Sequence, residues 1–429
     1  MKKIFITLLL VCFTMIVSAQ NLLDLYKSGT VKLTPDTEYA KSNDWDKVFK
    51  TYYDTLYNKP MGNRKSLVIL PDGSVVVNHA YHNYYSKFSP DGTFQKEFGI
   101  INSKGNRFKR TQYIAGIVNN NTFYTGLNNM GNMICFDFEG NYKKTLKLNY
   151  MAHQMRALPN GKIAVVGWVI WKAKFRDFVA IVDYETNEEK VIWEHFTNRG
   201  EFGKHDKLFN YSYRFKEQGA ISCSTMPFSK SLGLVARPEI ACVNNQLVVA
   251  NPNNGEIMTF DLYGNLISKK QMDLANNQIS VEEQKTIQLK AIERFKSMNP
   301  LRYEGFVGKV TAEESRKVHN YLISEMEADL KKITKPIEKP YFSTMIKDSD
   351  DNLLLFEYAE KQGGNKFNVW IYKDGGEFIC KSSFVCDDYE LQIHPGKIVF
   401  RDGYIYGLQI LKNATGVPLR LTRFKLSGM

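Results

Sequence analysis

Seven residues have side chains suited to binding or catalysis, although they lie far apart in the sequence. They are His153, Arg156, Trp168, Trp171, Arg237, Glu239 and His394. An arginine guanidinium offers a fixed fork of donors to a carboxylate or a sulfate, and an imidazole can act as a general base. Tryptophan rings can bind the faces of sugars. These residues can act together only if the fold brings them to one place.

A separate candidate is the pair His79 and His82, because histidine is a common metal ligand. Residues three apart on a β-strand point to opposite faces, so these two imidazoles would not share an ion. The sequence also has no Gly-rich phosphate loop, Gly-x-Ser-x-Gly elbow, His-Glu-x-x-His or Cys-x-x-Cys. We therefore predict no metal site and no cofactor, and we assign no catalytic residue. Calcium or zinc would be the ion in the enzyme alternative given below.

The elements that must position these residues are strands, because one strand–turn–strand unit recurs along the chain. Copies with an Asp or Gly turn between apolar or aromatic strand ends occupy 88–94, 136–142, 181–187, 260–266 and 371–376. Six hairpins are predicted at 66–78, 113–126, 156–167, 240–251, 342–357 and 396–408. Self-similarity at a spacing of about 40 to 50 residues is typical of a β-propeller.

The predicted fold is all-β: a six-bladed β-propeller with a two-helix insertion. The third and fourth hairpins are unusually far apart, so residues 198–238 are either an insertion or a degraded seventh blade. Seven blades are therefore the alternative. The innermost strands of such a ring line a central channel, which would gather His153, Arg156, Arg237, Glu239 and His394, together with Gln112 and Ser343. Trp168 and Trp171 are expected on a loop between strands.

The sequence between residues 280 and 333 predicts helices and not strands. Ser280 and Thr311 each open a predicted capping box. Apolar residues of the second helix fall on one stripe, at Val318, Leu322, Met326, Leu330 and Ile333. We expect the two helices to pack on the propeller or on each other, either as a structural flap or as a lid that docks a partner.

The first residues predict a signal peptide, because Lys2 and Lys3 precede an apolar run at 4–17. The predicted domains are this signal peptide at 1–19, an N-terminal segment at 20–60 that closes the last blade, blades at 61–272, the helical insertion at 273–339 and the remaining blades at 340–429. We expect an exported protein, periplasmic or on the outer surface, with no transmembrane segment.

Charge and cysteine content limit the partners only loosely. The chain has 57 Lys and Arg against 45 Asp and Glu, a net charge of +12, which becomes +10 without Lys2 and Lys3. The basic residues are dispersed, which together with export argues against a nucleic-acid partner and favours a basic but unspecialised surface. Of six cysteines, five remain after signal cleavage, so at least one is unpaired.

The segment Phe88-Ser-Pro-Asp-Gly-Thr-Phe-Gln-Lys-Glu-Phe-Gly99 resembles the repeat of NHL-like and TolB-like six-bladed propellers. The helical insertion, followed by Pro340-Tyr341-Phe342 and residues 348–356, is similar to secreted six-bladed propellers of Gram-negative gut-type bacteria. The resemblance covers about residues 60–425. It implies the architecture, and it says almost nothing of the activity, because propellers host many functions.

The sequence favours a secreted, monomeric binding module for a glycan, peptide or partner protein, because it offers many loops and no catalytic signature. The alternative is a propeller enzyme, either a metal-dependent hydrolase or a polysaccharide lyase. Its site would be in the central channel, at His153, Arg156, Glu239 and His394. The sequence leaves open whether the protein is an enzyme.

Overall fold

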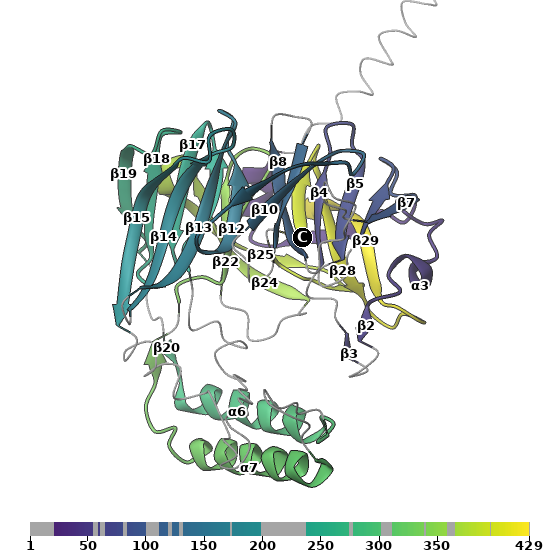
Figure 1. Cartoon of the computed structure of the whole chain (residues 1–429), viewed down its shortest axis with the longest axis vertical. Coiled ribbons are helices and arrows are strands. Elements are labelled where there is room, and N and C mark those ends of the chain that lie inside the picture. The colour runs from purple at the N-terminus through teal and green to yellow at the C-terminus, as the bar shows by residue number, and fades with distance from the viewer. Residues whose placement is uncertain are drawn as a thin grey trace, which may run out of the picture.

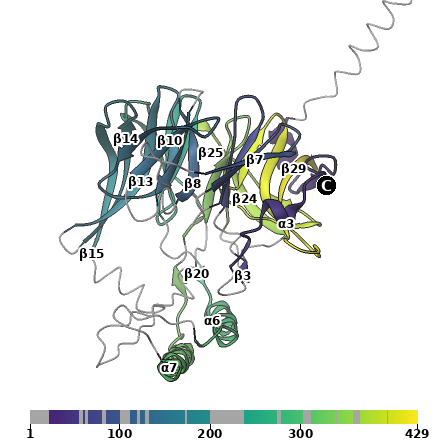
Figure 2. The same cartoon turned by 45° about the vertical axis from the view of Figure 1, so that its right-hand side comes forward.

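The strands form sheets arranged around an axis as the blades of a β-propeller (Figures 1 and 2). The computed structural model describes residues 21–54, 59–60, 65–79, 84–99, 111–118, 122–127, 132–171, 174–198, 237–273, 278–301, 311–338, 340–357, 365–394 and 396–428. Four sheets have four strands each, and a fifth has nine. The predicted all-β propeller fold is therefore confirmed. The predicted signal peptide at 1–19 and most of residues 198–238 lie outside the described residues.

Each four-stranded sheet is an antiparallel meander of consecutive strands. The first holds β4 (Lys65–Ile69), β5 (Val75–His79), β6 (Tyr84–Phe88) and β7 (Phe94–Gly99), and the second holds β8 (Thr111–Val118), β9 (Thr122–Leu127), β10 (Asn132–Asp137) and β11 (Tyr142–Lys147). The third holds β12 (Met151–Ala157), β13 (Lys162–Trp171), β14 (Lys174–Asp183) and β15 (Glu189–Asn198), and the fourth holds β16 (Glu239–Val243), β17 (Gln246–Asn251), β18 (Glu256–Phe260) and β19 (Leu266–Gln271).

The nine-stranded sheet contains two further meanders joined by a strand from the N-terminus. One comprises β22 (Thr344–Lys347), β23 (Leu353–Phe356), β24 (Lys366–Lys373) and β25 (Glu377–Val385), and the other comprises β26 (Tyr389–Glu390), β27 (Ile398–Arg401), β28 (Tyr404–Leu411) and β29 (Leu419–Gly428). Strand β1 (Val31–Pro35) pairs antiparallel with β29 and parallel with β25. The first and the last described strands therefore lie in one sheet, which covers edges that would otherwise be exposed.

All six predicted hairpins are present, as β4–β5, β8–β9, β12–β13, β16–β17, β22–β23 and β27–β28. The first strand of each hairpin is the innermost of its blade. Strand β8 contacts β4 and β12, β16 contacts β12 and β22, and β27 contacts β4. In this order β12 and β27 lie on opposite sides of the axis.

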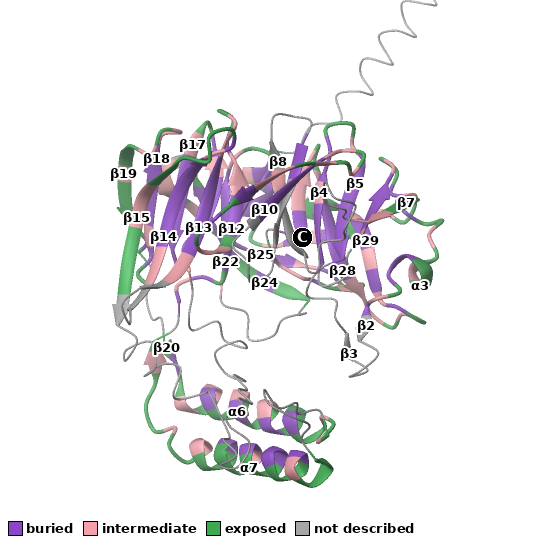
Figure 3. Ribbon diagram, in the orientation of Figure 1, coloured by how far each residue is buried: buried purple, intermediate pink, exposed green. Residues whose placement is uncertain are grey.

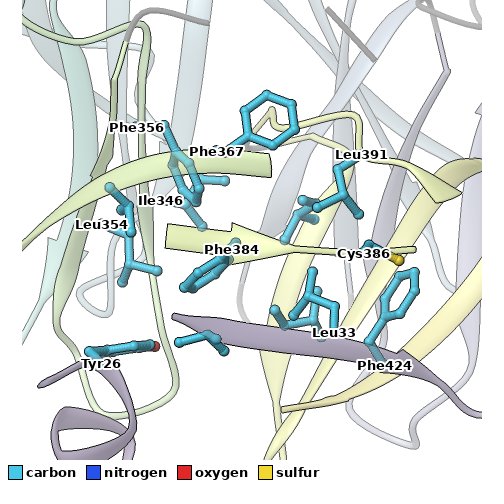
Figure 4. Close-up of a cluster of buried hydrophobic side chains, with 14 of the residues drawn as sticks. Tyr26, Leu33, Ile346, Leu354, Phe356, Phe367, Phe384, Cys386, Leu391 and Phe424 are labelled. Atoms are coloured by element: carbon cyan, nitrogen blue, oxygen red, sulfur yellow. The ribbon is translucent and has the colours of Figure 1, made fainter. Parts of the chain in front are cut away.

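The nine-stranded sheet, called the joined sheet below, has its own core, built partly by the N-terminal helix α2 (Leu22–Lys27) (Figure 4). Tyr26, Leu33 and Phe384 come from α2, β1 and β25, and each is at most 2% exposed. The buried Tyr26 hydroxyl donates to Asp348 Oδ2 at 2.9 Å, so the polar end of this ring has a partner. This core holds the N-terminal strand between the two meanders.

The recurring Asp turn has one hydrogen-bond pattern in three blades. Asp137 Oδ1 accepts the N–H groups of Glu139 and Asn141, and Asn141 Nδ2 donates to Asp137 Oδ2 at 3.0 Å. Asp261 with Asn265, and Asp348 with Asn352, repeat it. An aspartate that accepts bonds from the backbone two and more residues ahead fixes the turn, which explains why this unit recurs.

Lysines of one blade bind the turn of the next. Lys87 donates to the carbonyl of Phe138, Lys144 to that of Tyr184, and Lys190 to that of Tyr263. Lys87 and Lys144 also pair with Glu139 and Glu185. Part of the positive charge thus stabilises contacts between neighbouring blades, by about 0–1 kcal/mol for each exposed pair.

The insertion is a helical hairpin of α6 (Val281–Lys296) and α7 (Ala312–Leu330), set beyond the ring and connected to it through the short strands β20 (Gln278–Ile279) and β21 (Ile337–Glu338) (Figure 1). The helices pack on each other through a separate cluster of Ile292, Phe295, Val318, Leu322 and Met326. Figure 3 shows their outer surfaces exposed. Of the predicted stripe, Val318, Leu322 and Met326 are buried.

The remaining elements are a short helix α3 (Trp45–Val48), a two-stranded ribbon of β2 (Tyr53–Asp54) and β3 (Lys59–Pro60), and a 3-10 turn at Asp374–Gly376. Among the described residues, no helix is both long and apolar enough to cross a membrane.

Thr311 begins α7 with the predicted capping box, in which its side chain and Glu314 bind each other's backbone N–H groups. We expect Thr311→Ala to cost about 0.5–2 kcal/mol, and to speed amide hydrogen exchange in the helical hairpin only, because this hairpin has its own core. Ser324→Ala, at an exposed position of α7, is the control and should leave exchange unchanged. Equal loosening of the propeller strands would contradict this prediction.

Candidate functional site

His153 lies on β12, the innermost strand of its blade, at a β-bulge. Ala152 pairs with Gly167 and Gln154 pairs with Val166, so His153 is the extra, unpaired residue. A bulge turns a side chain away from the regular alternation, and bulges are frequent beside functional sites. The imidazole is exposed although its strand is the innermost of the blade. The surface it exposes therefore faces the middle of the ring or its mouth.

His394 approaches the same region from the opposite side, just before β27, and is also exposed. Its Nδ1 accepts the N–H of Gly396 at 3.0 Å, so a neutral ring carries its proton on Nε2. Surrounding protein lowers the pKa of His394, and the charges of Lys397, His153 and Arg156 lower it further. His394 is thus a neutral donor at physiological pH.

His153 acts on His394 across the axis. The pKa of His153 is also lowered, first by the surrounding protein and then by the positive charges of Arg237 and Arg156. The partners of His394 include His153 and Arg156, both from β12. Because β12 and β27 face each other across the ring, the side chains of His153 and Arg156 and those of His394 and Lys397 come from opposite sides of its axis. We call these four residues the central cluster.

Lys397 was not predicted from the sequence. It is only 6% exposed, and burial lowers the pKa of its ammonium group to about 8. No sequence pattern distinguishes it from the many dispersed lysines. Its position three residues after His394, at the start of the last innermost strand, is the signal that identifies it once the fold is known.

Glu239, the first residue of β16, is buried at 8% exposure beside the central cluster. Its Oε2 accepts from Gln154 Nε2 at 3.2 Å, from Thr344 Oγ1 at 3.2 Å and from the Met345 N–H at 3.4 Å. The carboxyl group therefore connects β12, β16 and β22. Burial raises the pKa of Glu239 to about 7, although Arg156 and these hydrogen bonds oppose the rise.

Arg156 lies two residues after Gln154 on β12, and therefore on the same face as the amide that holds Glu239. Its Nη1 donates to the Met155 carbonyl at 2.7 Å, which orients the guanidinium. It lowers the pKa of Glu239 and of both histidines, so its charge reaches all three groups. Arg156 is the one residue whose charge acts to lower all three pKa values.

Arg237 and Trp168 lie side by side, and their side chains contact each other. Arg237 Nε donates to Asp177 Oδ1 at 3.0 Å, and its guanidinium lies 5.1 Å from the Trp168 ring centroid. This contact joins the third and fourth blades, and the positive charge of Arg237 also lowers the pKa of His153. Trp168 and Trp171 lie within β13, so their assignment to a loop was wrong, because an unbroken apolar run gives no sign of where the strand ends. The side chain of Trp171 lies outside the described residues.

The other predicted positions contribute less. Ser343 is exposed, and its hydroxyl donates to the Phe356 carbonyl at 3.1 Å. Gln112 is on β8, with its side chain outside the described residues. His79 is fully buried, between Lys65 Nζ at 3.2 Å and Ser86 Oγ at 2.8 Å, and His82 lies outside the described residues. His79 is a core histidine.

The described part of the chain contains no group of three His, Cys, Asp or Glu side chains that could hold a metal ion. Cys135, Cys242, Cys380 and Cys386 are free thiols, so Cys380 and Cys386 do not form a bridge. Cys223 lies outside the described residues.

No family model matches the chain, and no curated protein matches it. Among solved structures, a member of the DUF4221 family from Bacteroides vulgatus is similar at 11% identity and a TM-score of 0.45, over 94% of this chain and 100% of that chain. A virginiamycin B lyase from Staphylococcus aureus is similar at 11% identity and a TM-score of 0.39, over 86% and 85% of the two chains. The assignment of the fold rests on the sheets described above.

Proposed function

We propose that the protein is an exported β-propeller that binds a glycan or a peptide at the central cluster. The observation that carries this proposal is that two exposed histidines, His153 on β12 and His394 just before β27, come from innermost strands on opposite sides of the ring. Residues from distant parts of the sequence thus converge at one exposed place. A ring of packed blades holds such groups in fixed positions, so little conformational entropy is lost on binding.

The central cluster offers mainly donors. Arg156 and Lys397 are positive at neutral pH, and the His394 ring presents an N–H group. Arg237 adds a further positive charge, which is paired with Asp177. Hydroxyl, carbonyl and carboxylate oxygens of a glycan or peptide are the complementary groups.

Replacing Arg156 with glutamine should weaken ligand binding about tenfold or more, because a hydrogen bond to a charged group contributes about 1.5–3 kcal/mol. Calorimetric titration with panels of neutral and acidic oligosaccharides and peptides measures this loss. Arg176→Gln is the matched control, because Arg176 pairs with Glu194 away from the cluster. Equal affinities of the two variants for every ligand would rule out the central cluster as the binding site.

A second candidate function is a polysaccharide lyase, favoured by the neutral His153 imidazole close to the charge of Arg156. In such a reaction His153 would remove the proton beside a uronate carboxylate, while Arg156 offsets the charge that develops. The C–O bond at the β-carbon then breaks, its carbon gains a double bond, and the leaving oxygen takes a proton from water. Incubation with polygalacturonate tests this, since the unsaturated product absorbs ultraviolet light; an unchanged spectrum would eliminate it. A metal-dependent hydrolase has no comparable observation in its favour.

The same proposal includes the number of blades, the type of propeller and the cellular location of the protein. We infer six blades of the NHL-like or TolB-like type, supported by four separate sheets and by the two meanders of the joined sheet. A seventh blade would have to lie within residues 199–236. The apolar run at 4–17 supports export to the periplasm or the outer surface. We propose a monomer whose partners are glycans, peptides or proteins rather than nucleic acid.

A further inference from the structure

We propose that the central cluster recognises a carboxylate on its ligand, and that the buried side chain of Glu239 is a built-in competitor that weakens this recognition when it ionises. The inference rests on the proposed function and names the chemical class of the ligand. The carboxylate can belong to a uronate sugar or to an acidic peptide, and these two sources are separated in the experiment below.

The cluster contains the groups that a carboxylate requires. A guanidinium binds a carboxylate with two parallel donors, and the bond from Arg156 Nη1 to the Met155 carbonyl orients this guanidinium in the cluster. Lys397 supplies a second cation, and His394 supplies a neutral N–H donor fixed by Gly396. Because both histidines stay neutral, they add donors without adding charge that would depend on pH near neutrality.

Glu239 is placed to compete for the same guanidinium. It faces Arg156 from the neighbouring blade, since Gln154 holds its carboxyl group on the face of β12 that carries Arg156. From β22 it meets only neutral donors, Thr344 and the Met345 N–H. The other charged or titratable groups of the site are His153, His394, Lys397 and Arg237. Arg156 acts on both histidines, Lys397 acts on His394, and Arg237 acts on His153.

The direction of the pH dependence follows from this arrangement. Below a pH of about 7 Glu239 is mostly protonated, so it carries no negative charge that competes with the ligand carboxylate for Arg156. Above that pH Glu239 carries a negative charge that attracts Arg156 and repels the ligand carboxylate. Uronate and peptide carboxylates remain ionised throughout this range. Affinity should therefore fall as pH rises through neutrality.

The experiment measures the dissociation constant of trigalacturonate at about pH 6 and about pH 7.5 for the wild-type protein and for Glu239→Gln. We expect affinity of the wild type to fall about three- to tenfold over this range, and affinity of Glu239→Gln to stay nearly constant, because glutamine keeps the acceptor oxygen without a charge. Lys397 begins to lose its proton toward pH 8, so Lys397→Gln is measured in parallel. The pH dependence should persist in that variant.

Three further arms separate the outcomes. Maltotriose has no carboxylate and should not bind, and an acidic tripeptide compared with its amidated neutral counterpart tests the peptide source. If neutral ligands bind in an Arg156-dependent manner and trigalacturonate and the acidic tripeptide do not, the carboxylate inference is wrong and the proposed binding site stands. If no ligand shows Arg156-dependent binding, both are wrong. If Glu239→Gln keeps the full pH dependence, Glu239 is not the competitor.

Discussion

Replacing Phe384 with alanine is expected to destabilise the protein by about 3–5 kcal/mol, the usual cost of removing a buried phenylalanine. Phe384 is 1% exposed on β25. Its ring centroid lies 6.0 Å from that of Tyr26 and 5.6 Å from that of Phe356. Because Phe384 also pairs with Val31 of β1, its loss leaves a cavity where the N-terminal strand joins the sheet. Denaturation with urea measures the change.

Phe378→Ala is the matched control, because Phe378 is on the same strand and is 52% exposed. Its replacement should change the free energy of unfolding by no more than about 0.5 kcal/mol. Limited proteolysis adds a local readout, since a loosened β1 should be cut first in Phe384→Ala. Similar losses of stability in both variants would contradict the described core of the joined sheet.

The second large effect is expected at Gly140, in the turn between β10 and β11. Gly140 has φ +90°, and a Cβ atom there would lie 2.4 Å from Cδ2 of Phe98 in the preceding blade. Gly140→Ala therefore combines a left-handed backbone cost of about 1–2 kcal/mol with an overpacking cost of about 1–3 kcal/mol. We expect a total of about 2–5 kcal/mol, measured by urea denaturation.

Gly29→Ala separates these two costs. Gly29 has the same φ of +90° but no atom within 4 Å of the added Cβ, so only the backbone cost should remain. Combining Gly140→Ala with Phe98→Ala should recover part of the overpacking cost, which a double-mutant cycle reports as a coupling energy. If Gly140→Ala costs no more than Gly29→Ala, the close approach of the two blades is not rigid.

Much of the fold could be predicted from turns. Pro71-Asp72-Gly73 and Pro159-Asn160-Gly161 each mark a hairpin, because proline fixes one φ and glycine adopts a positive one. The pairing of β1 with both β25 and β29 could not be predicted in detail, since strand partners distant in sequence leave no local pattern. The two helices pack on each other and not on the ring. An apolar stripe shows only that one face of a helix is buried, and it does not specify which element covers that face.

The site was predictable only in part. Histidine and arginine are candidates because of their side-chain chemistry. The predicted propeller gave a reason to group His153, Arg156 and His394, since its innermost strands line one channel. Lys397 resembles every other lysine in the sequence, and the role of Glu239 depends on a hydrogen bond from Gln154 in another blade. The bulge at His153 depends on register with β13, which the sequence of β12 does not reveal.

The pairing of Val31 with Gly428 has a consequence for how the protein is made. Translation produces β1 well before its two partners β25 and β29, so the growing chain carries β1 without its antiparallel partner until β29 has been made. Contacts this distant in sequence form slowly. A ribosome that stops before β29 releases a polypeptide with bare strand edges, which is prone to aggregate. Chaperones therefore have a long interval in which to bind the nascent polypeptide before it becomes compact.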